Sequence, residues 1–291
     1  MNKCAFVVPL HPKHYQYGYY IFDHLLNKTV DLYFVFTDTR DKDIFLSNLD
    51  KIHSDKLKYL ILNEFADIRI VERTNSFVSI KKLFALSVLK DKYDYISCID
   101  SEIRFLNDTD INYYTIMKNI VDSEIICGGK LPSDTCDRQI VINGLTRLTE
   151  QKYHSELQVL SDNFRVYTWW CNLPVYYCKI AEEFLHWINF TSTTLDRFSW
   201  DVFDDMTYNF FCMLFHGYTF KLIEGCFHSL EFSDSAVVEH VNNTMCKLYW
   251  VNNKAYSKNK DYYKNNNFHI VFHLDRWENI KPTLKNNRYE D

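Results

Sequence analysis

Apolar runs alternate with amphipathic segments along the first third of the chain. Four runs lack the regular polar positions of a strand with one face in water, so they predict buried strands at residues 5–9, 32–36, 57–62 and 95–99. Between them, apolar residues at helical spacing predict helices at residues 15–26, 43–49 and 79–89. This alternation predicts an α/β fold with a mixed, mostly parallel sheet that helices cover on both faces.

The second half of the chain has a less regular pattern. Short apolar runs predict strands at residues 125–129, 139–142, 164–170, 219–223 and 268–274. Helical spacing predicts a strand or turn leading into a helix over residues 175–190, and a helix over residues 200–215. Residues 251–267 are rich in Asn and Lys, which is typical of a loop or a lid.

Composition and charge exclude several classes of partner and compartment. The formal net charge is −5, so no basic excess indicates a nucleic-acid partner. We find no stretch apolar enough for a transmembrane segment, and the apolar run at the N-terminus stops at Pro9, too early for a signal peptide. The nine cysteines are scattered and form no CxxC pair. We therefore expect a cytoplasmic protein without a cysteine-based zinc site.

The scarcity of glycine restricts how the chain can bind a nucleotide. Only six glycines occur, and they form neither a GxxxxGK[ST] phosphate loop nor a GxGxxG dinucleotide turn. A nucleotide bound to this protein must therefore have its phosphates neutralised in another way. A divalent cation held by carboxylates is the obvious substitute.

The strand predicted at residues 95–99 ends in two acids, Asp100 and Glu102, separated by Ser101. In a parallel sheet, ligands bind beyond the carboxyl ends of the strands. The loops after the first and second strands, Pro9-Leu10-His11 and Thr37-Asp38, are expected at that same edge. The acids could hold a divalent cation there, or they could simply solvate the end of a strand, because a D-x-E triplet is common by chance.

The stretch SIKKLFALSVLKDKYDYISCIDSEIRFL, at residues 79–106, resembles the region through the DxD motif of GT-A-fold glycosyltransferases. That motif follows a helix and an apolar strand in the family, as Asp100-Ser101-Glu102 does here, although Glu102 stands where the family has Asp. The resemblance covers the order of elements over about the first 130 residues. It implies a GT-A-like, Rossmann-like fold, Mn²⁺ or Mg²⁺ as cofactor, a nucleotide sugar (a UDP-sugar by family habit) as donor, and a glycan acceptor.

The resemblance also implies roles for individual residues. Asp100 and Glu102 would hold the metal against the diphosphate, with His273 as a candidate further ligand. Asp38 would contact the base or ribose, although it could equally be a turn-forming residue. Lys82, or its neighbour Lys81, would contact ribose or phosphate, unless both lie on a solvated helix face. The residues expected around the nucleotide are Pro9, Leu10, His11, Asp38, Lys82, Asp100 and Ser101.

A second group of acids, Asp201, Asp204 and Asp205, lies near the start of the helix predicted at residues 200–215. Acids at a helix start stabilise its exposed N–H groups, which suffices to explain Asp201. In inverting GT-A enzymes, an acid in such a place takes the proton of the acceptor hydroxyl. The resemblance therefore implies Asp205 or Asp204 as the catalytic base, with Asp205 slightly favoured. An enzyme that retains configuration would need no such base.

These expectations combine into one functional hypothesis. The chain is a single GT-A-like domain over residues 1–291, with a nucleotide-sugar-binding half (about 1–130), an acceptor-binding half (about 131–250) and a C-terminal lid or tail (251–291). It would act as a hexosyl- or pentosyltransferase on a hydroxyl group of a glycan. The alternatives are a sugar nucleotidyltransferase, which normally has a more glycine-rich first loop, and a non-catalytic glycan-binding domain.

Overall fold

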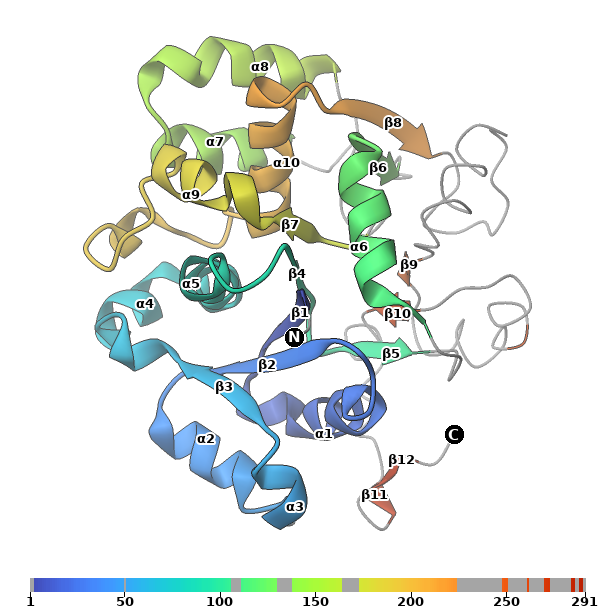
Figure 1. The fold of residues 1–291 in the computed structure, drawn as a ribbon. Helices are drawn as coiled ribbons and strands as arrows, with labels where there is room; N and C mark the ends of the chain where they lie inside the picture. Colours follow the sequence, from blue (N-terminus) through green and yellow to red (C-terminus); the bar gives the residue numbers. More distant parts are fainter. Residues whose placement is uncertain are drawn as a thin grey trace.

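A five-stranded sheet forms the centre of the fold in the computed structural model (Figure 1). Its strands lie in the order β3-β2-β1-β4-β7. Their bounds are β1 (Cys4–Pro9), β2 (Asp31–Phe36), β3 (Lys58–Ile61), β4 (Tyr95–Cys98) and β7 (Val175–Tyr177). The structure describes residues 3–49, 51–105, 111–129, 138–163, 173–223, 248–250, 261, 270–272, 284–285 and 288–289.

The sheet is mixed but mostly parallel, as the sequence predicts. β1 pairs in parallel with β2 and with β4, and β2 pairs in parallel with β3. β7 closes the edge beside β4 and runs antiparallel to it. The chain adds β2 and β3 on one side of β1 and then returns to place β4 on the other side. This reversal of strand order creates a switch point between β1 and β4, where the loops that leave the two strands diverge.

Helices cover both faces of the sheet because successive side chains of each strand point to opposite sides. In β1, Ala5 and Val7 face one core, and Phe6 and Val8 face the other. The first core includes residues from α4 (Ile68–Thr74), α5 (Phe77–Leu89), α7 (Arg138–Leu148), α8 (His154–Asn163), α9 (Cys178–Trp187) and α10 (Asp204–Phe215). The second core includes residues from α1 (Tyr15–Leu25), α2 (Thr39–Leu46) and α6 (Tyr113–Asp122).

Shorter elements complete the described part of the chain. β6 (Ile125–Gly129) pairs in parallel with β8 (Thr219–Ile223). β5 (Ile103–Phe105), β10 (Ile270–Phe272) and β9 (Leu248–Trp250) form a three-stranded sheet in that order. The others are α3 (Lys51–Ser54), η1 (Pro12–His14), η2 (Leu62–Glu64), η3 (Gln151–Tyr153), η4 (Leu195–Arg197) and the pair β11 (Leu284–Lys285) and β12 (Arg288–Tyr289).

Three predictions about local structure need correction. Residues 139–142 are not a strand but part of α7, because Val141, Ile142 and Leu145 lie on one helical face and pack into the first core. The second predicted helix begins earlier than residue 43, since the Asp38 side chain caps α2 by accepting the Asp41 N–H. The helix predicted from residue 200 begins only at Asp204. The strand predicted at residues 164–170 lies outside the described residues.

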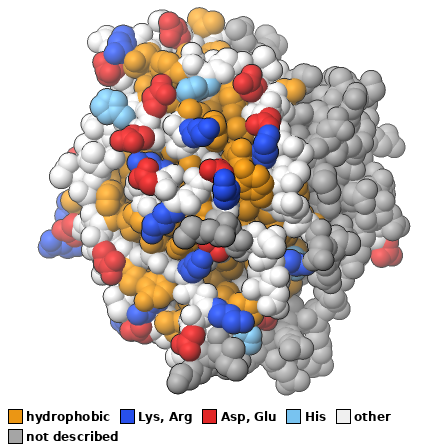
Figure 2. Space-filling model, viewed as in Figure 1, with side chains coloured by type: hydrophobic (Ala, Val, Ile, Leu, Met, Phe, Trp, Pro, Cys, Tyr) orange, Lys and Arg blue, Asp and Glu red, His pale blue; other side chains and the backbone are white. Residues whose placement is uncertain are grey.

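The surface visible in Figure 2 carries mixed charge. Acidic and basic side chains are interspersed over this face, between patches of apolar side chains. Of the helices that the structure describes, none is both long enough and apolar enough to cross a membrane.

Gly144 sets the distance between α7 and the loop that leads into α10. A Cβ atom at this position would lie 2.6 Å from the carbonyl oxygen of Asp201, which belongs to that loop. A contact this short with backbone cannot be relieved by a change of rotamer. We therefore expect Gly144→Ala to destabilise the protein by about 1–3 kcal/mol, although Ala is the better helix former by ~1 kcal/mol.

Urea denaturation of the purified variant checks this expectation. Gly18→Ala is the comparison, because its added Cβ would meet only side-chain atoms of Leu10 and Phe45, at 3.0 Å. The loss of stability in Gly18→Ala should be smaller than in Gly144→Ala. An unchanged or higher stability of Gly144→Ala would show that the loop before α10 moves aside easily.

Candidate functional site

The candidate site lies at the switch point, where the loops after β1 and β4 leave the sheet. The two strands stay in register up to this edge, since the N–H of Ile99 donates to the carbonyl oxygen of Val7 at 2.9 Å. The loop after β1 is tied to β2 through the N–H of Leu10, which donates to the carbonyl oxygen of Val35 at 3.0 Å. The acids that follow β4 therefore project from a fixed edge of the sheet.

Asp100 and Asp204, which are far apart in the sequence, share the ammonium group of Lys82. Lys82 Nζ lies 2.9 Å from Asp100 Oδ1 and 3.6 Å from Asp204 Oδ1. The side chains of Lys82 and Asp204 are only 6% and 4% exposed, whereas that of Asp100 is 15% exposed. A buried lysine thus joins the acid at the end of β4 to the acid that begins α10. The sequence indicates all three residues as site candidates, but it does not predict that Lys82 contacts both acids.

The alternation of side chains along β4 explains why Asp100 meets Lys82. Ile96 and Cys98 face the first core, on the side of α5. Asp100 continues this alternation beyond the end of the strand and so points toward the same helix. Burial by itself lowers the pKa of a lysine, but the ion pairs with Asp100 and Asp204 outweigh burial and raise the pKa of Lys82. Lys82 therefore remains a cation at physiological pH.

Asp204 is held by a second contact, from the edge strand β7. The Tyr176 hydroxyl, which is buried, donates to Asp204 Oδ2 at 2.6 Å. Burial raises the pKa of Asp204, while Lys82 and the Tyr176 hydrogen bond oppose this rise because both stabilise the ionised form. One carboxylate oxygen of Asp204 faces Lys82, and the other accepts the hydrogen bond from Tyr176. Asp204 is therefore suited to holding these two side chains in position.

Asp205 has a different environment from Asp204. Its side chain is partly exposed and lines a cavity between α6, β7 and α10. Burial and the neighbouring Asp204 carboxylate raise the pKa of Asp205 to about 7, against the opposing effect of Lys82. Both acids lie in the first turn of α10, where the helix dipole favours negative charge. Asp205 is thus an accessible carboxyl group that can exchange a proton near neutral pH.

Glu102, the second acid after β4, is held by His14 and Ser101 rather than by Lys82. His14 Nδ1 lies 2.7 Å from Ser101 Oγ and 3.3 Å from Glu102 Oε1, and the Ser101 hydroxyl donates to Glu102 Oε2 at 3.0 Å. His14 and Ser101 are buried, whereas the side chain of Glu102 is 15% exposed. The side chains of both acids after β4 are therefore partly exposed, and each contacts a buried group. Asp100 contacts Lys82, and Glu102 contacts His14 and Ser101.

The other predicted residues lie along the same edge. Pro9 ends β1, and the carbonyl oxygen of Leu10 accepts a hydrogen bond from Lys81 Nζ at 2.6 Å. Burial lowers the pKa of Lys81 to about 8, although Asp41 and Asp38 act in the opposite direction. The exposed His11 caps η1 by accepting the N–H of Lys13.

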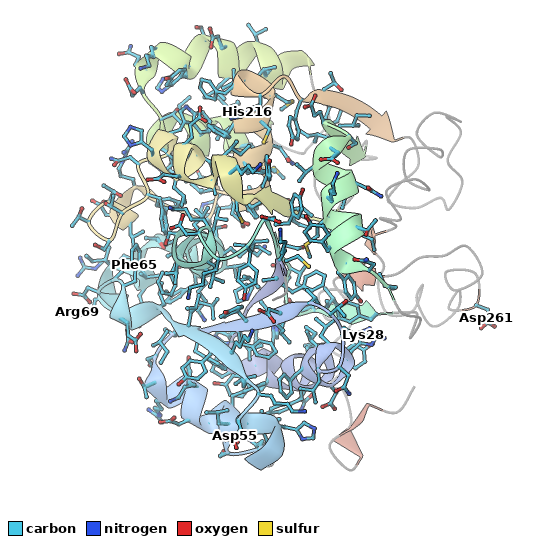
Figure 3. All side chains as sticks on the ribbon, in the orientation of Figure 1. Lys28, Asp55, Phe65, Arg69, His216 and Asp261 are labelled. Carbon is cyan, nitrogen blue, oxygen red and sulfur yellow. The ribbon has the colours of Figure 1, made fainter. Side chains whose placement is uncertain are left out.

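Asp38 and Ser101 have structural partners, as described above, and a role of either residue toward a nucleotide stays a prediction. Asp201, the third acid of the second group, does not cap α10. It pairs instead with Arg147 of α7. His216 lies at the other end of α10 from Asp204 and Asp205 and pairs with Glu183 of α9 at 3.5 Å (Figure 3).

The two acids at this edge offer donor atoms of the type that a divalent cation takes in proteins. Mg²⁺ is commonly held by one or two carboxylates together with the phosphates of a substrate. Asp100 and Glu102 supply two such carboxylates, both partly exposed. No group of three His, Cys, Asp or Glu side chains suited to a metal occurs among the described residues. His273, the predicted further ligand, lies outside them.

Sequence reasoning missed two residues of the site, His14 and Tyr176. His14 follows the first strand, and its position just after the predicted loop Pro9-Leu10-His11 is the feature of the sequence that could have identified it as a site residue. Tyr176 lies in a short apolar run with no polar neighbour to mark it. Its role depends on the pairing of β7 with β4, which places Tyr176 opposite Ile96.

Comparison with known proteins adds no relative to this description. No protein-family model matches the chain, and no curated protein matches it significantly. The assignment of a function therefore depends on the geometry of the site and on the motif resemblance described above.

We expect Lys82→Met to destabilise the protein strongly, because two buried or half-buried carboxylates would lose their cation. Removal of one partner from a buried ion pair costs about 3–5 kcal/mol. The double variant Lys82→Met/Asp204→Asn should recover part of this loss, since it leaves one unpaired acid fewer. Urea denaturation at pH 7 measures both. A loss below about 1 kcal/mol, the size expected for a surface pair, would show that Lys82 does not stabilise the cluster.

Asp205 predicts a specific pH dependence of stability. Its pKa in the folded protein, about 7, lies above the ordinary value of 3.8. The folded state therefore binds an extra proton between these values, and the associated stabilisation is full below pH 3.8 and is lost as the pH rises through 7. Asp205→Asn should gain stability relative to the unmodified protein between pH 5 and pH 8.

Denaturation curves across this pH range measure the effect. Asp91→Asn is the control, because it removes one carboxylate from a side chain that is 81% exposed. A parallel pH profile for Asp205→Asn and the unmodified protein would contradict the raised pKa.

Proposed function

We propose that this chain is a metal-dependent glycosyltransferase with a GT-A-like fold. It transfers a sugar from a nucleotide sugar, a UDP-sugar by family resemblance, to a hydroxyl group of a glycan acceptor. The donor would bind over the switch point between β1 and β4. The acceptor would approach from the side of α10.

One observation carries this proposal. The two acid groups that the sequence singles out, Asp100 after β4 and Asp204-Asp205 at the start of α10, meet at one place through Lys82. An inverting transferase for nucleotide sugars needs this combination, because the leaving diphosphate and the attacking hydroxyl lie on opposite sides of one sugar carbon. A strand end that was merely solvated by acids would require no such convergence.

The residues have distinct tasks in the proposed reaction. Asp100 and Glu102 would hold Mn²⁺ or Mg²⁺, which when bound offsets the charge that develops on the departing diphosphate. Lys82 pairs with Asp100 and holds it in place, and His14 with Ser101 orients Glu102. Asp205 would accept the proton of the acceptor hydroxyl. Its pKa of about 7 suits a general base near neutral pH.

The decisive test is a screen of nucleotide sugars for hydrolysis by the purified protein, with and without Mn²⁺. We expect one donor to be hydrolysed only with the metal. Asp100→Asn should lower this rate by about 100-fold or more, the effect of losing one group that stabilises transition-state charge. The same variant should lose the thermal stabilisation by UDP and Mn²⁺ together.

Asp91→Asn serves as the matched control, since Asp91 is exposed and precedes β4 at the opposite edge of the sheet. It should keep full activity. Hydrolysis that survives Asp100→Asn would refute the proposed metal site. Binding of UDP and Mn²⁺ without any turnover would favour the non-catalytic glycan-binding domain, and release of pyrophosphate from a nucleoside triphosphate and a sugar phosphate would favour the nucleotidyltransferase.

A further inference from the structure

Trp200 is the largest exposed apolar residue in the described part of the chain. It is 57% exposed and belongs to the loop of residues 198–203, which leads into α10. The loop does bury other apolar side chains, since Phe198 and Val202 lie in the first core at 2% exposure each. The two ring faces make up most of the surface of an indole group, so an exposure of this size leaves part of a ring face open to a ligand.

Hydrogen bonds and an ion pair fix the backbone of this loop. The Val202 N–H donates to the carbonyl oxygen of Ser199 at 2.9 Å and closes a tight turn. Asp201 pairs with Arg147 of α7, whose Nε–H also donates to the carbonyl oxygen of Arg197 at 2.7 Å. The exposed indole group is thus presented on a backbone that is already ordered, which lowers the entropic cost of binding a ligand there.

The loop lies at the same edge of the sheet as the candidate site. The buried Ser79 hydroxyl, near the start of α5, donates to the carbonyl oxygen of Val202 at 2.8 Å. Ser79 is three residues before Lys82, so the two side chains lie on the same face of α5, about one turn apart. The loop is therefore bonded to α5 next to the lysine that joins the acids of the site.

The exposed apolar surface of the described chain is scattered rather than continuous. The other exposed large apolar residues lie on α2, β3, both ends of α5, α8 and the last turn of α10: Ile44, Tyr59, Val78, Val88, Val159 and Phe215. A stable protein interface covers about 800 Å² on each partner, whereas a sugar ring needs only one aromatic face. A sugar therefore fits the surroundings of Trp200 better than a second protein does.

We propose that Trp200 stacks against a sugar ring of the acceptor glycan, one that lies further along the glycan than the ring that receives the new sugar. The choice of ligand rests on the proposed function. Trp200 is five residues before Asp205, and five residues span at most about 18 Å. An oligosaccharide whose reactive hydroxyl lies at Asp205 can therefore extend to the indole group. The C–H groups on one face of a pyranose ring supply the apolar surface that an aromatic ring face complements.

The test measures how binding to the full chain depends on the length of the glycan. Cello-, malto- and chito-oligosaccharides serve as probes, each from the monosaccharide to the hexasaccharide, in titrations followed by tryptophan fluorescence. We expect one series to bind more tightly as its length increases and to shift the emission to shorter wavelength. Trp200→Ala should lower the affinity for the longest member about 10-fold, as for an aromatic contact on which binding depends, and leave the monosaccharide unaffected.

Further variants separate stacking from a general effect on the fold. Trp200→Phe keeps an aromatic face, so it should recover part of the affinity but lose the shift in emission. In transfer assays, Trp200→Ala should raise the KM for long acceptors and leave kcat unchanged. Its urea denaturation curve should match that of the unmodified protein, because the side chain is exposed. Tyr59→Ala, which removes another exposed aromatic side chain from β3, is the control and should change none of these quantities.

The outcomes separate this inference from the proposed function. Length-dependent binding that Trp200→Ala abolishes, in a protein without metal-dependent donor hydrolysis, would overturn the proposed function and leave the glycan contact standing. Donor hydrolysis with a length dependence that Trp200→Ala does not alter would overturn the role of Trp200 alone, as would binding of none of the probes. A lower molar mass of Trp200→Ala in light scattering, with glycan binding unchanged, would assign the residue to a contact between two copies of the chain instead.

Discussion

The buried ammonium group of Lys82 is the interaction on which the candidate site depends. It neutralises Asp100 at the end of β4 and Asp204 at the start of α10, and neither acid could stay buried or half-buried and ionised without it. Tyr176 adds a hydrogen bond to Asp204 and thereby connects the edge strand to the same cluster. The positions of α5, α10 and β7 are thus fixed relative to one another by charge as well as by packing.

This cluster leaves Asp205 in an unusual electrostatic position. The single positive charge of Lys82 already faces two carboxylates, those of Asp100 and Asp204. A proton on Asp205 therefore reduces the excess of negative charge in the cluster. The same circumstance keeps the group close to the protonation equilibrium that a general base requires. Asp100 and Glu102, by contrast, contact Lys82 and the pair of His14 and Ser101, respectively. The acids of the site therefore differ in chemistry because their partners differ.

Sequence patterns predict the parts of the fold that local periodicity determines. The strands β1 to β4 are short apolar runs between clear breaks, and the loops after β1, β2 and β4 share one edge because parallel strands require it. Residues 139–142 were assigned to a strand incorrectly, because four apolar-rich residues do not distinguish a strand from part of a helix. Helices α4, α6 and α8 were not predicted, although α6 buries Tyr113, Met117 and Ile120 at helical spacing. Lys82 was predicted as a ligand-binding residue, but no pattern could predict that it pairs with Asp204, since that contact depends on how α10 packs against α5.

The antiparallel pairing of β4 with β7 has a consequence for cooperativity. The half expected to bind the donor ends before β7, and the half expected to bind the acceptor contains it, yet the two strands belong to one hydrogen-bonded sheet. Separating the halves would expose the open edge of β4 and the apolar faces of α5 and α10 together. We therefore expect the described parts of the two halves that share this sheet to unfold together, and neither part is a module that could be exchanged intact between proteins.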